Sequence, residues 1–408
     1  MTELIGVLIA FVVLGVLIYR KVDFGLSILI ASGIMLAFIK PDLEGLQWLF
    51  EISIEYDTLE LVAAIVLIGY LGYIYRDSEQ VDRLILSLRG IFKDRRVIVA
   101  SIPAVFGLMP MPGGALVSAP MIQDEGDALG LDGVHKAFIN WWFRHIWFSV
   151  YPISLGLIIT SKLSGVNIYR IALFNSPIFI ASIVIGTIWG LGYIRKEENV
   201  NSGQEKKRGR HILSILWWLS PIFLALGLNL AFNVPFFISL AVSVMFLILQ
   251  NHKKYSLRKV PLLLKDGFSV NLLMAAYGIM LFKGIVERSE ALVPAVDVLQ
   301  SYIPILAVVI ISSLFIGMIM GHLPAAVGIG LPVLIPLLPV VNVQTIAMVY
   351  LFIMLGYLIS PIHLCIILTI EYFEADLSKF YKRAKISILL LAASIVVWLF
   401  IRGSFFYF

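Results

Sequence analysis

The sequence predicts an all-α polytopic membrane protein made of two inverted repeats, each with five spans, a re-entrant hairpin and a broken helix. Sixty per cent of the 408 residues are hydrophobic, 14% are charged and the mean hydropathy is +0.96, which is more apolar surface than a soluble fold can bury. Apolar runs of about 17–25 residues recur along the chain, as helical spans require, and they do not show the ten-residue alternation of barrel strands. Helices in a bilayer are therefore expected.

Two proline motifs organise the chain. PGGALVSAP at 112–120 and PAAVGIGLP at 324–332 each place two prolines around small residues, and the segments YPISLGLIIT (151–160) and SPIHLCIILT (360–369) follow them. Proline removes a backbone donor and breaks a helix. Corresponding interrupted segments in two halves of a membrane chain indicate a transporter site built from broken helices.

The first repeat is predicted to cover residues 1–195. Its first two spans, within 4–39, are expected to form a scaffold, followed by a hairpin at 97–123 and a span at 135–162 that breaks at Tyr151 and Pro152. Two further spans are expected at 59–75 and 171–194. The polar, basic segment 196–211 is too hydrophilic to insert and is interpreted as a cytoplasmic linker between the repeats.

The second repeat, residues 212–408, follows the same order. Scaffold spans are expected within 212–250, a hairpin at 304–339 and a broken span at 344–370. Its remaining spans are predicted at 268–286 and 384–401. The two halves align in order at a nearly constant offset, which indicates an internal duplication.

The positive charges predict the topology. With the amino terminus outside, most of the 31 Lys and Arg fall in cytoplasmic loops, as the positive-inside rule requires. Each half then crosses the membrane five times. Because this number is odd, the second repeat is inverted relative to the first, and both termini lie outside. Basic clusters beside spans hold helices at the cytoplasmic leaflet, so the net charge of +5 indicates a bilayer partner and not a nucleic acid.

Three segments carry a family resemblance: FGLMPMPGGALVSAPM (106–121), NWWFRHIWFSVYP (140–152) and LFKGIVERSEAL (281–292). They resemble the membrane-protein group called domain of unknown function 401, which is similar to gluconate and citrate permeases of the ion-transporter superfamily. The resemblance implies a homodimeric elevator transporter in the cytoplasmic membrane of a prokaryote. In such a protein, paired hairpins and broken helices carry an anion past a fixed scaffold.

Arg144 is the first candidate for the substrate site. A guanidinium within a span costs about 2.5–3.5 kcal/mol on insertion scales and usually faces a cavity, a partner or an ion. Asn140 lies one helical turn before it on the same face. Two alternatives are snorkelling to the headgroups and pairing with an acid of the 124–127 loop, such as Glu125 or Asp127.

The turn of the first hairpin is a second candidate. Small residues at Gly113 and Gly114, after Pro112, leave backbone N–H groups of a helix start uncovered, and a helix N-terminus attracts anions. Ser118 would allow a ligand to approach closely. The alternative is simple helix packing through small residues.

Three residues near the breaks complete the prediction. His322 beside Pro324 in the second hairpin, and His363 after Pro361, both sit at interruptions of helices. His363 aligns with Ser154 of the first repeat, so the two side chains are expected to line opposite sides of one cavity. The alternative for each histidine is a hydrogen bond with a purely structural role.

These observations predict a secondary active transporter of a small organic anion, a carboxylate or a sugar acid, coupled to a proton or sodium gradient. HExxH, GxSxG and P-loop motifs are absent from the sequence, so no enzyme and no cofactor are expected; any metal site stays unassigned. The alternative is an ion channel or a cation/proton antiporter with re-entrant hairpins. A channel would show ohmic current, and a transporter saturable uptake.

Overall fold

Every regular element in the described part of the computed structural model is a helix. The structure describes residues 2–109, 114–195, 208–256, 258–289 and 304–408. The predicted linker therefore lies largely outside the described residues, and so do Pro112 and Gly113 of the predicted site.

The first half of the chain forms a series of helices interrupted at polar or proline-containing turns. Aspartate or asparagine side chains cap several of them, as at Asp23, whose carboxylate accepts hydrogen bonds from the N–H groups of Gly25 and Leu26; such caps satisfy donors that have no partner within the helix. The elements are α1 (Thr2–Tyr19), α2 (Phe24–Ile39), α3 (Leu43–Ile54), α4 (Tyr56–Asp77), α5 (Gln80–Ile91), α6 (Arg95–Gly107), α7 (Gly114–Ala128), α8 (Gly133–His145), η1 (Ile146–Ser149), α9 (Leu155–Ser164), α10 (Ile168–Phe174), α11 (Ser176–Ile185) and η2 (Gly186–Leu191).

The second half of the chain is also a series of helices interrupted by short breaks. Asn342 forms a capping box with Thr345 at the start of one of its long helices. The elements are α12 (Arg208–Phe232), α13 (Phe236–Gln250), α14 (Val260–Gly267), α15 (Val270–Ser289), α17 (Ile305–Met320), α18 (Leu323–Leu334), η5 (Ile335–Leu337), α19 (Val343–Ile359), α20 (Leu364–Tyr372), α21 (Leu377–Ile401) and η6 (Ser404–Tyr407).

Five helical segments of the described residues are long and apolar enough to cross a membrane. They are α4, α12, α15, the segment Val343–Tyr372, which contains α19 and α20 with the break between them, and α21. A sixth is added if α9 and α10, bent by 117°, count as one span. Shorter apolar helices include α1, α2, α11, α13, α17 and α18. The prediction of an all-α polytopic membrane protein is confirmed at this level.

Burial divides the helices into a core and a periphery. In α8 and α19 nearly every residue is buried, which is the behaviour of helices surrounded by other helices. In contrast, α1, α12 and α21 expose large apolar side chains such as Leu8, Phe223 and Phe400. Exposed apolar surface on this scale is typical of contact with lipid or another protein.

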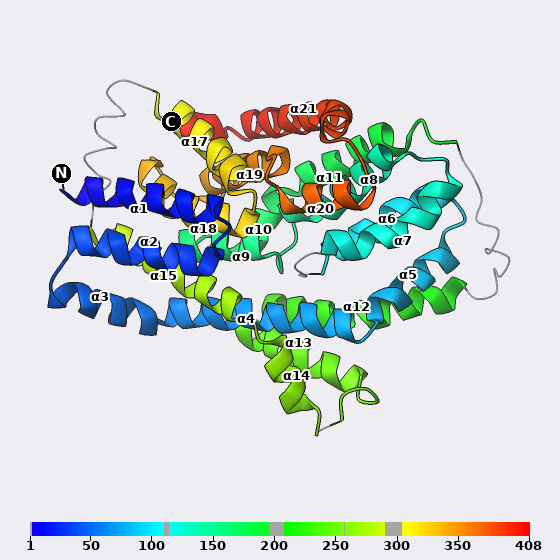
Figure 1. Cartoon of the computed structure of the whole chain (residues 1–408), viewed down its shortest axis with the longest axis horizontal. Helices are drawn as coiled ribbons and strands as arrows, with labels where there is room; N and C mark the ends of the chain where they lie inside the picture. The colour runs from blue at the N-terminus through cyan, green and yellow to red at the C-terminus, as the bar shows by residue number, and fades with distance from the viewer. Residues whose placement is uncertain (1, 110–113, 196–207, 257, 290–303) are drawn as a thin grey trace.

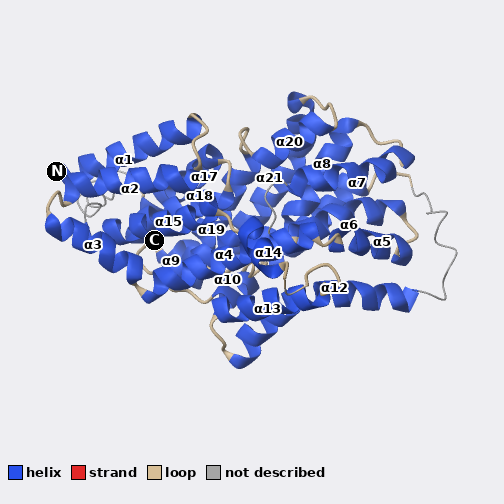
Figure 2. Ribbon diagram, turned by 60° about the horizontal axis from the view of Figure 1, so that its bottom comes forward, coloured by secondary structure: helices blue, strands red, loops and turns tan. Residues whose placement is uncertain are grey.

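The helices run mostly along the long axis of the molecule (Figure 1). Helix α2 packs against α15 and α4 packs against α13, while α7 packs against α20 and α18 against α9. The pair α6–α7 lies toward one end of the long axis and the pair α17–α18 toward the other, as both views show (Figures 1 and 2). The candidate site lies between these two pairs.

Candidate functional site

A cavity of about 230 Å³ lies where the two helix pairs and the two helix breaks meet. The first half of the chain lines it with Gly107, the last residue of α6, with Met109 just after this helix, and with residues around the break between η1 and α9. The second half lines it with residues 321–324 between α17 and α18, and with side chains around the break between α19 and α20. Helices α4 and α15 close the remaining side.

Arg144 is buried, with 6% of its surface exposed, and lines this cavity from the last turn of α8. Its guanidinium lies so close to Gly114, the first residue of α7, that a methyl group at Gly114 would collide with it. Of the acids considered as its partners, which are Asp124, Glu125 and Asp127, two are engaged elsewhere: Glu125 pairs with Arg89 and Arg95, and Asp127 pairs with Lys136. The burial also disfavours snorkelling to headgroups.

Asn140 and Ser118, two predicted site residues, lie behind Arg144 in the protein core. The Ser118 hydroxyl donates to the side-chain oxygen Oδ1 of Asn140 at 2.6 Å. The side-chain nitrogen Nδ2 of Asn140 donates to the Ala115 backbone carbonyl and to the Thr369 hydroxyl, both at 3.1 Å. Both side chains are fully buried. They tie α7, α8 and α20 together and support the cavity wall without lining it.

The first helix break presents two hydroxyl groups to the cavity. Ser154 is the N-cap of α9, where its hydroxyl accepts a hydrogen bond from the Leu157 N–H, and it lines the cavity. Tyr151 is 6% exposed, and its hydroxyl has no hydrogen-bond partner among the described residues. Because buried polar groups are normally hydrogen-bonded, the Tyr151 hydroxyl is suited to a polar group inside the cavity.

The junction between α17 and α18 forms the opposite wall. Gly321 ends α17 with φ +56°, a left-handed conformation that favours glycine, and it packs on Ile362. The next residue, His322, is the N-cap position of α18 and has an exposed side chain, and Pro324 starts this helix. His322 and Pro324 both line the cavity, as Arg144 does.

His363 follows the second helix break and is 1% exposed at the cavity wall. Neither of its ring nitrogens has hydrogen-bond geometry with a described residue. Its ring packs against Tyr357, with 4.1 Å between the ring centroids, and against His145, with 4.8 Å. A ligand in the cavity can therefore reach a histidine whose polar atoms lack partners in the described structure.

Three residues close to His363 were not predicted as site residues: Tyr357 and Cys365, which line the cavity, and His145, which lies behind its wall. The Tyr357 hydroxyl lies 3.1 Å from His145 Nε2, and Cys365 lines the cavity together with Tyr357. More than 200 residues separate His145 from the other two, so no local pattern connects them. The only signal available in the sequence was the alignment of the two broken segments, which places all three near breaks.

A second cavity, of about 170 Å³, adjoins the first. The two share Gly69 of α4 and Leu272 of α15, and the second also contacts Arg76 and Asp266. Arg76 and Asp266 belong to segments whose basic residues predict a cytoplasmic location. The pair of cavities thus extends from the helix breaks toward that end of α4.

The fold and the cavity define a class: a polytopic helical membrane protein with a largely apolar cavity, into which a few polar side chains such as Arg144 and His363 project, at the meeting point of two helix breaks. The sequence matches, over residues 3–402, the family described as "Protein of unknown function (DUF401)". The chain therefore belongs to this family. No curated protein matches it.

Proposed function

We propose that this protein is a secondary active transporter that moves a small organic anion, a carboxylate or a sugar acid, by alternating access. The observation that carries the proposal is the cavity of about 230 Å³, in which the buried Arg144 shares the wall with Tyr151 and His363. A buried guanidinium binds a carboxylate through two parallel hydrogen bonds. The volume lies below the roughly 300–1,000 Å³ of pockets for drug-sized ligands, which favours a small substrate.

The packing of the helices supports the proposed inverted repeats. In the alignment of the two halves, α2 corresponds to α13, α4 to α15, α7 to α18 and α9 to α20. The contact of α2 with α15 then corresponds to that of α13 with α4, and the contact of α7 with α20 to that of α18 with α9. A pseudo-two-fold axis through the cavity would produce this reciprocity.

The positions of the helix pairs support their entry from opposite faces. The pairs α6–α7 and α17–α18 lie toward opposite ends of the long axis (Figure 1). Gly107 and Met109, at the end of α6, and Gly321 and His322, between α17 and α18, nevertheless line the same cavity. Each pair then closes the cavity from its own side. Alternating access requires two such gates around one site.

An elevator movement in a homodimer follows as part of the proposal. The scaffold would be α1, α2, α12 and α13, whose exposed apolar residues, including Leu8, Phe223 and Met245, suit lipid or a second copy. The hairpins and broken helices would move as one unit. Cross-links within this unit should leave transport intact, and cross-links from the unit to the scaffold should stop it; the reverse pattern would rule out the elevator.

The direct test is uptake by full-length protein reconstituted in liposomes, using a panel of carboxylates and sugar acids with imposed sodium or pH gradients. We expect saturable uptake of at least one anion, driven by one of the two gradients, and none by protein carrying Arg144→Ala. The gradient that drives uptake identifies the coupling ion as H+ or Na+. Ohmic current without saturable uptake would contradict the proposal and favour a channel.

A further inference from the structure

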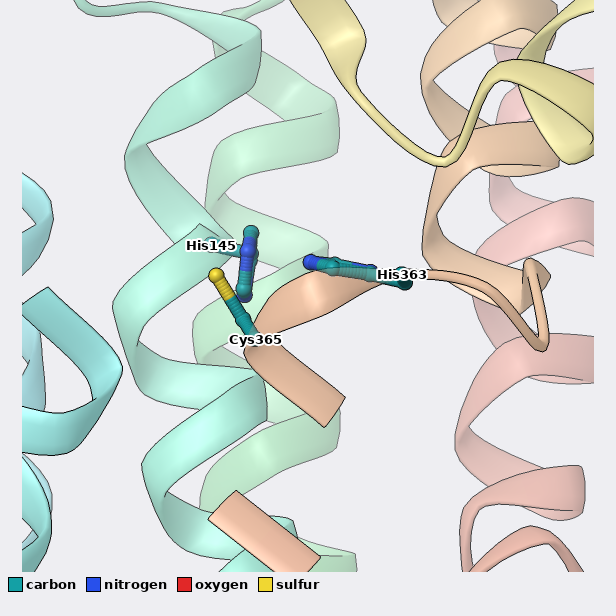
Figure 3. Close-up of side chains that lie close together, drawn as sticks. All are labelled: His145, His363 and Cys365. Atoms are coloured by element: carbon teal, nitrogen blue, oxygen red, sulfur yellow. The ribbon is translucent and has the colours of Figure 1, made fainter. Parts of the chain in front are cut away.

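His145, His363 and Cys365 form a cluster of metal-binding side chains next to the cavity, which His363 and Cys365 line. Their ligand atoms all lie within 4.8 Å of one another, and the three side chains point toward one another from α8, from the second helix break and from α20 (Figure 3). Both histidines are buried, with 4% and 1% of their surfaces exposed, and Cys365 is partly exposed. Nothing in the proposed anion site requires this combination.

The surroundings of His145 fix its ring in the form that binds metal ions. His145 Nδ1 lies 2.5 Å from the Trp141 carbonyl oxygen, to which it donates its proton. Nε2 then carries a lone pair, which accepts the hydrogen bond from Tyr357 at 3.1 Å. A metal ion bound at Nε2 would replace this hydrogen bond, and the Tyr357 hydroxyl would turn away from Nε2. A histidine that donates its other N–H to a backbone carbonyl is the usual arrangement of a metal ligand.

His363 provides the second, independent observation. Its side chain is buried and turned into the cluster, and neither ring nitrogen has a hydrogen-bond partner among the described residues. Leaving a buried imidazole without a partner is costly. A cation bound by the lone pair of one ring nitrogen would remove part of that cost.

The chemistry of the three ligands selects the ion. Two imidazoles and one thiolate suit zinc and similar transition metals, whereas Na+, Mg²⁺ and Ca²⁺ prefer oxygen ligands. Tetrahedral zinc with Zn–N near 2.0 Å and Zn–S near 2.3 Å separates its ligand atoms by about 3.3–3.6 Å. The side chains would therefore close by about 1 Å around the ion.

We propose that His145, His363 and Cys365 bind a zinc ion, with a fourth coordination position that faces the cavity lined by His363 and Cys365. This proposal does not depend on the proposed transport function. If both hold, the ion adds positive charge near Arg144 and strengthens the attraction of the cavity for an anion.

The test uses Co²⁺ as a spectroscopic substitute for zinc in the full-length purified protein, stripped of metal by a chelator and kept reduced. Because the chain has one cysteine, any thiolate-to-cobalt charge-transfer absorption must come from Cys365. We expect this absorption to saturate at one Co²⁺ per chain and to disappear when Zn²⁺ is added. Cys365→Ser should abolish it, and His363→Gln should weaken Co²⁺ binding by at least about tenfold.

The matched control is His252→Gln, which changes an exposed histidine outside the cluster and should leave the cobalt spectrum unchanged. Size-exclusion chromatography establishes that each variant is folded. The proposal is wrong if wild-type protein shows no charge-transfer absorption with excess Co²⁺, or if Cys365→Ser keeps it. Since the readout contains no transport step, this result is independent of the liposome experiment.

Discussion

The two helix breaks of this protein share a backbone design and differ in chemistry. One separates η1 from α9 at residues 150–154, the other separates α19 from α20 at residues 360–363, and both border the same cavity. The helix before the first break carries Arg144, whereas the aligned residue before the second is Ile353, which is fully buried. Both breaks thus contribute to the cavity wall, and Arg144, which only one of the two helices carries, contributes its charge.

The hydroxyl groups at the two breaks also differ, in whether they form a hydrogen bond within the protein. Ser360, aligned with Tyr151, donates its hydroxyl to the Met318 carbonyl at 2.6 Å. The Tyr151 hydroxyl has no such partner in the described part of the chain. At this pair of aligned positions, the second break therefore satisfies its hydroxyl group within the protein, and the first presents its hydroxyl group to the cavity.

The largest expected effect is that of Arg144. If its guanidinium binds the substrate carboxylate, Arg144→Ala removes a charge-assisted contact of about 1.5–3 kcal/mol, or roughly ten- to more than hundredfold in affinity. Arg144→Lys should also weaken binding, because an ammonium cannot form the bidentate pair. The measurement is the ligand-induced shift of melting temperature, with the anion that gives the strongest uptake in liposomes.

Ile353, the residue aligned with Arg144, provides the control. Ile353→Val should lower the free energy of unfolding by about 1 kcal/mol, because it removes a methylene group from the packed core. The ligand-induced shift should stay unchanged. An unchanged shift in Arg144→Ala would rule out direct substrate contact, and equal effects of the two variants on binding would contradict the division of roles between the breaks.

A smaller effect is expected from Gly114→Ala, which keeps the charge of Arg144 but fills the space next to its guanidinium. Displacing the guanidinium should reduce affinity about tenfold, or about 1.4 kcal/mol. The control is Gly227→Ala in α12, where the new methyl group meets no atom within 4 Å. This control should keep its affinity and gain about 0.5–1 kcal/mol of stability.

The smallest expected effect is that of the Tyr151 hydroxyl. Tyr151→Phe should weaken substrate binding by about 0.5–1.5 kcal/mol, the usual contribution of a neutral hydrogen bond, without destabilising the ligand-free protein. Ser360→Ala should do the opposite, lowering the melting temperature and leaving affinity unchanged, because its hydroxyl bonds within the protein. Melting curves with and without the anion measure both quantities, and a loss of stability in ligand-free Tyr151→Phe would contradict this assignment.

Much of the helical framework could be predicted from the sequence. The apolar runs predict helices, and prolines mark segments that leave the helical conformation, as around Pro152 and Pro361. The cost of burying a guanidinium identified Arg144 as a candidate without any knowledge of its neighbours. These inferences rest on properties that a residue keeps in any packing arrangement.

The composition of the cavity wall could not be predicted in the same way. Asn140 shared a helical face with Arg144, but its amide is bonded to Ala115 and Thr369 in the core. His145 and Cys365 lie far apart in the sequence and close together in the structure, and their proximity depends on how α8 and α20 pack. Helical periodicity describes one helix at a time and contains no information about which faces of distant helices meet.

The most direct test of the central claim, that this cavity admits small anions because of Arg144, uses Cys365 as a reporter. It is the single cysteine of the chain and lines the cavity, so its rate of modification by small thiol reagents reports their access. We predict that an anionic reagent reacts faster than a cationic one of similar size, relative to their rates with a free thiol in solution. The preference should disappear in Arg144→Gln. The protein is first stripped of metal by a chelator, so that the thiol of Cys365 is free to react. An equal preference in wild type and Arg144→Gln, or no modification of the folded, metal-free protein, would contradict the claim.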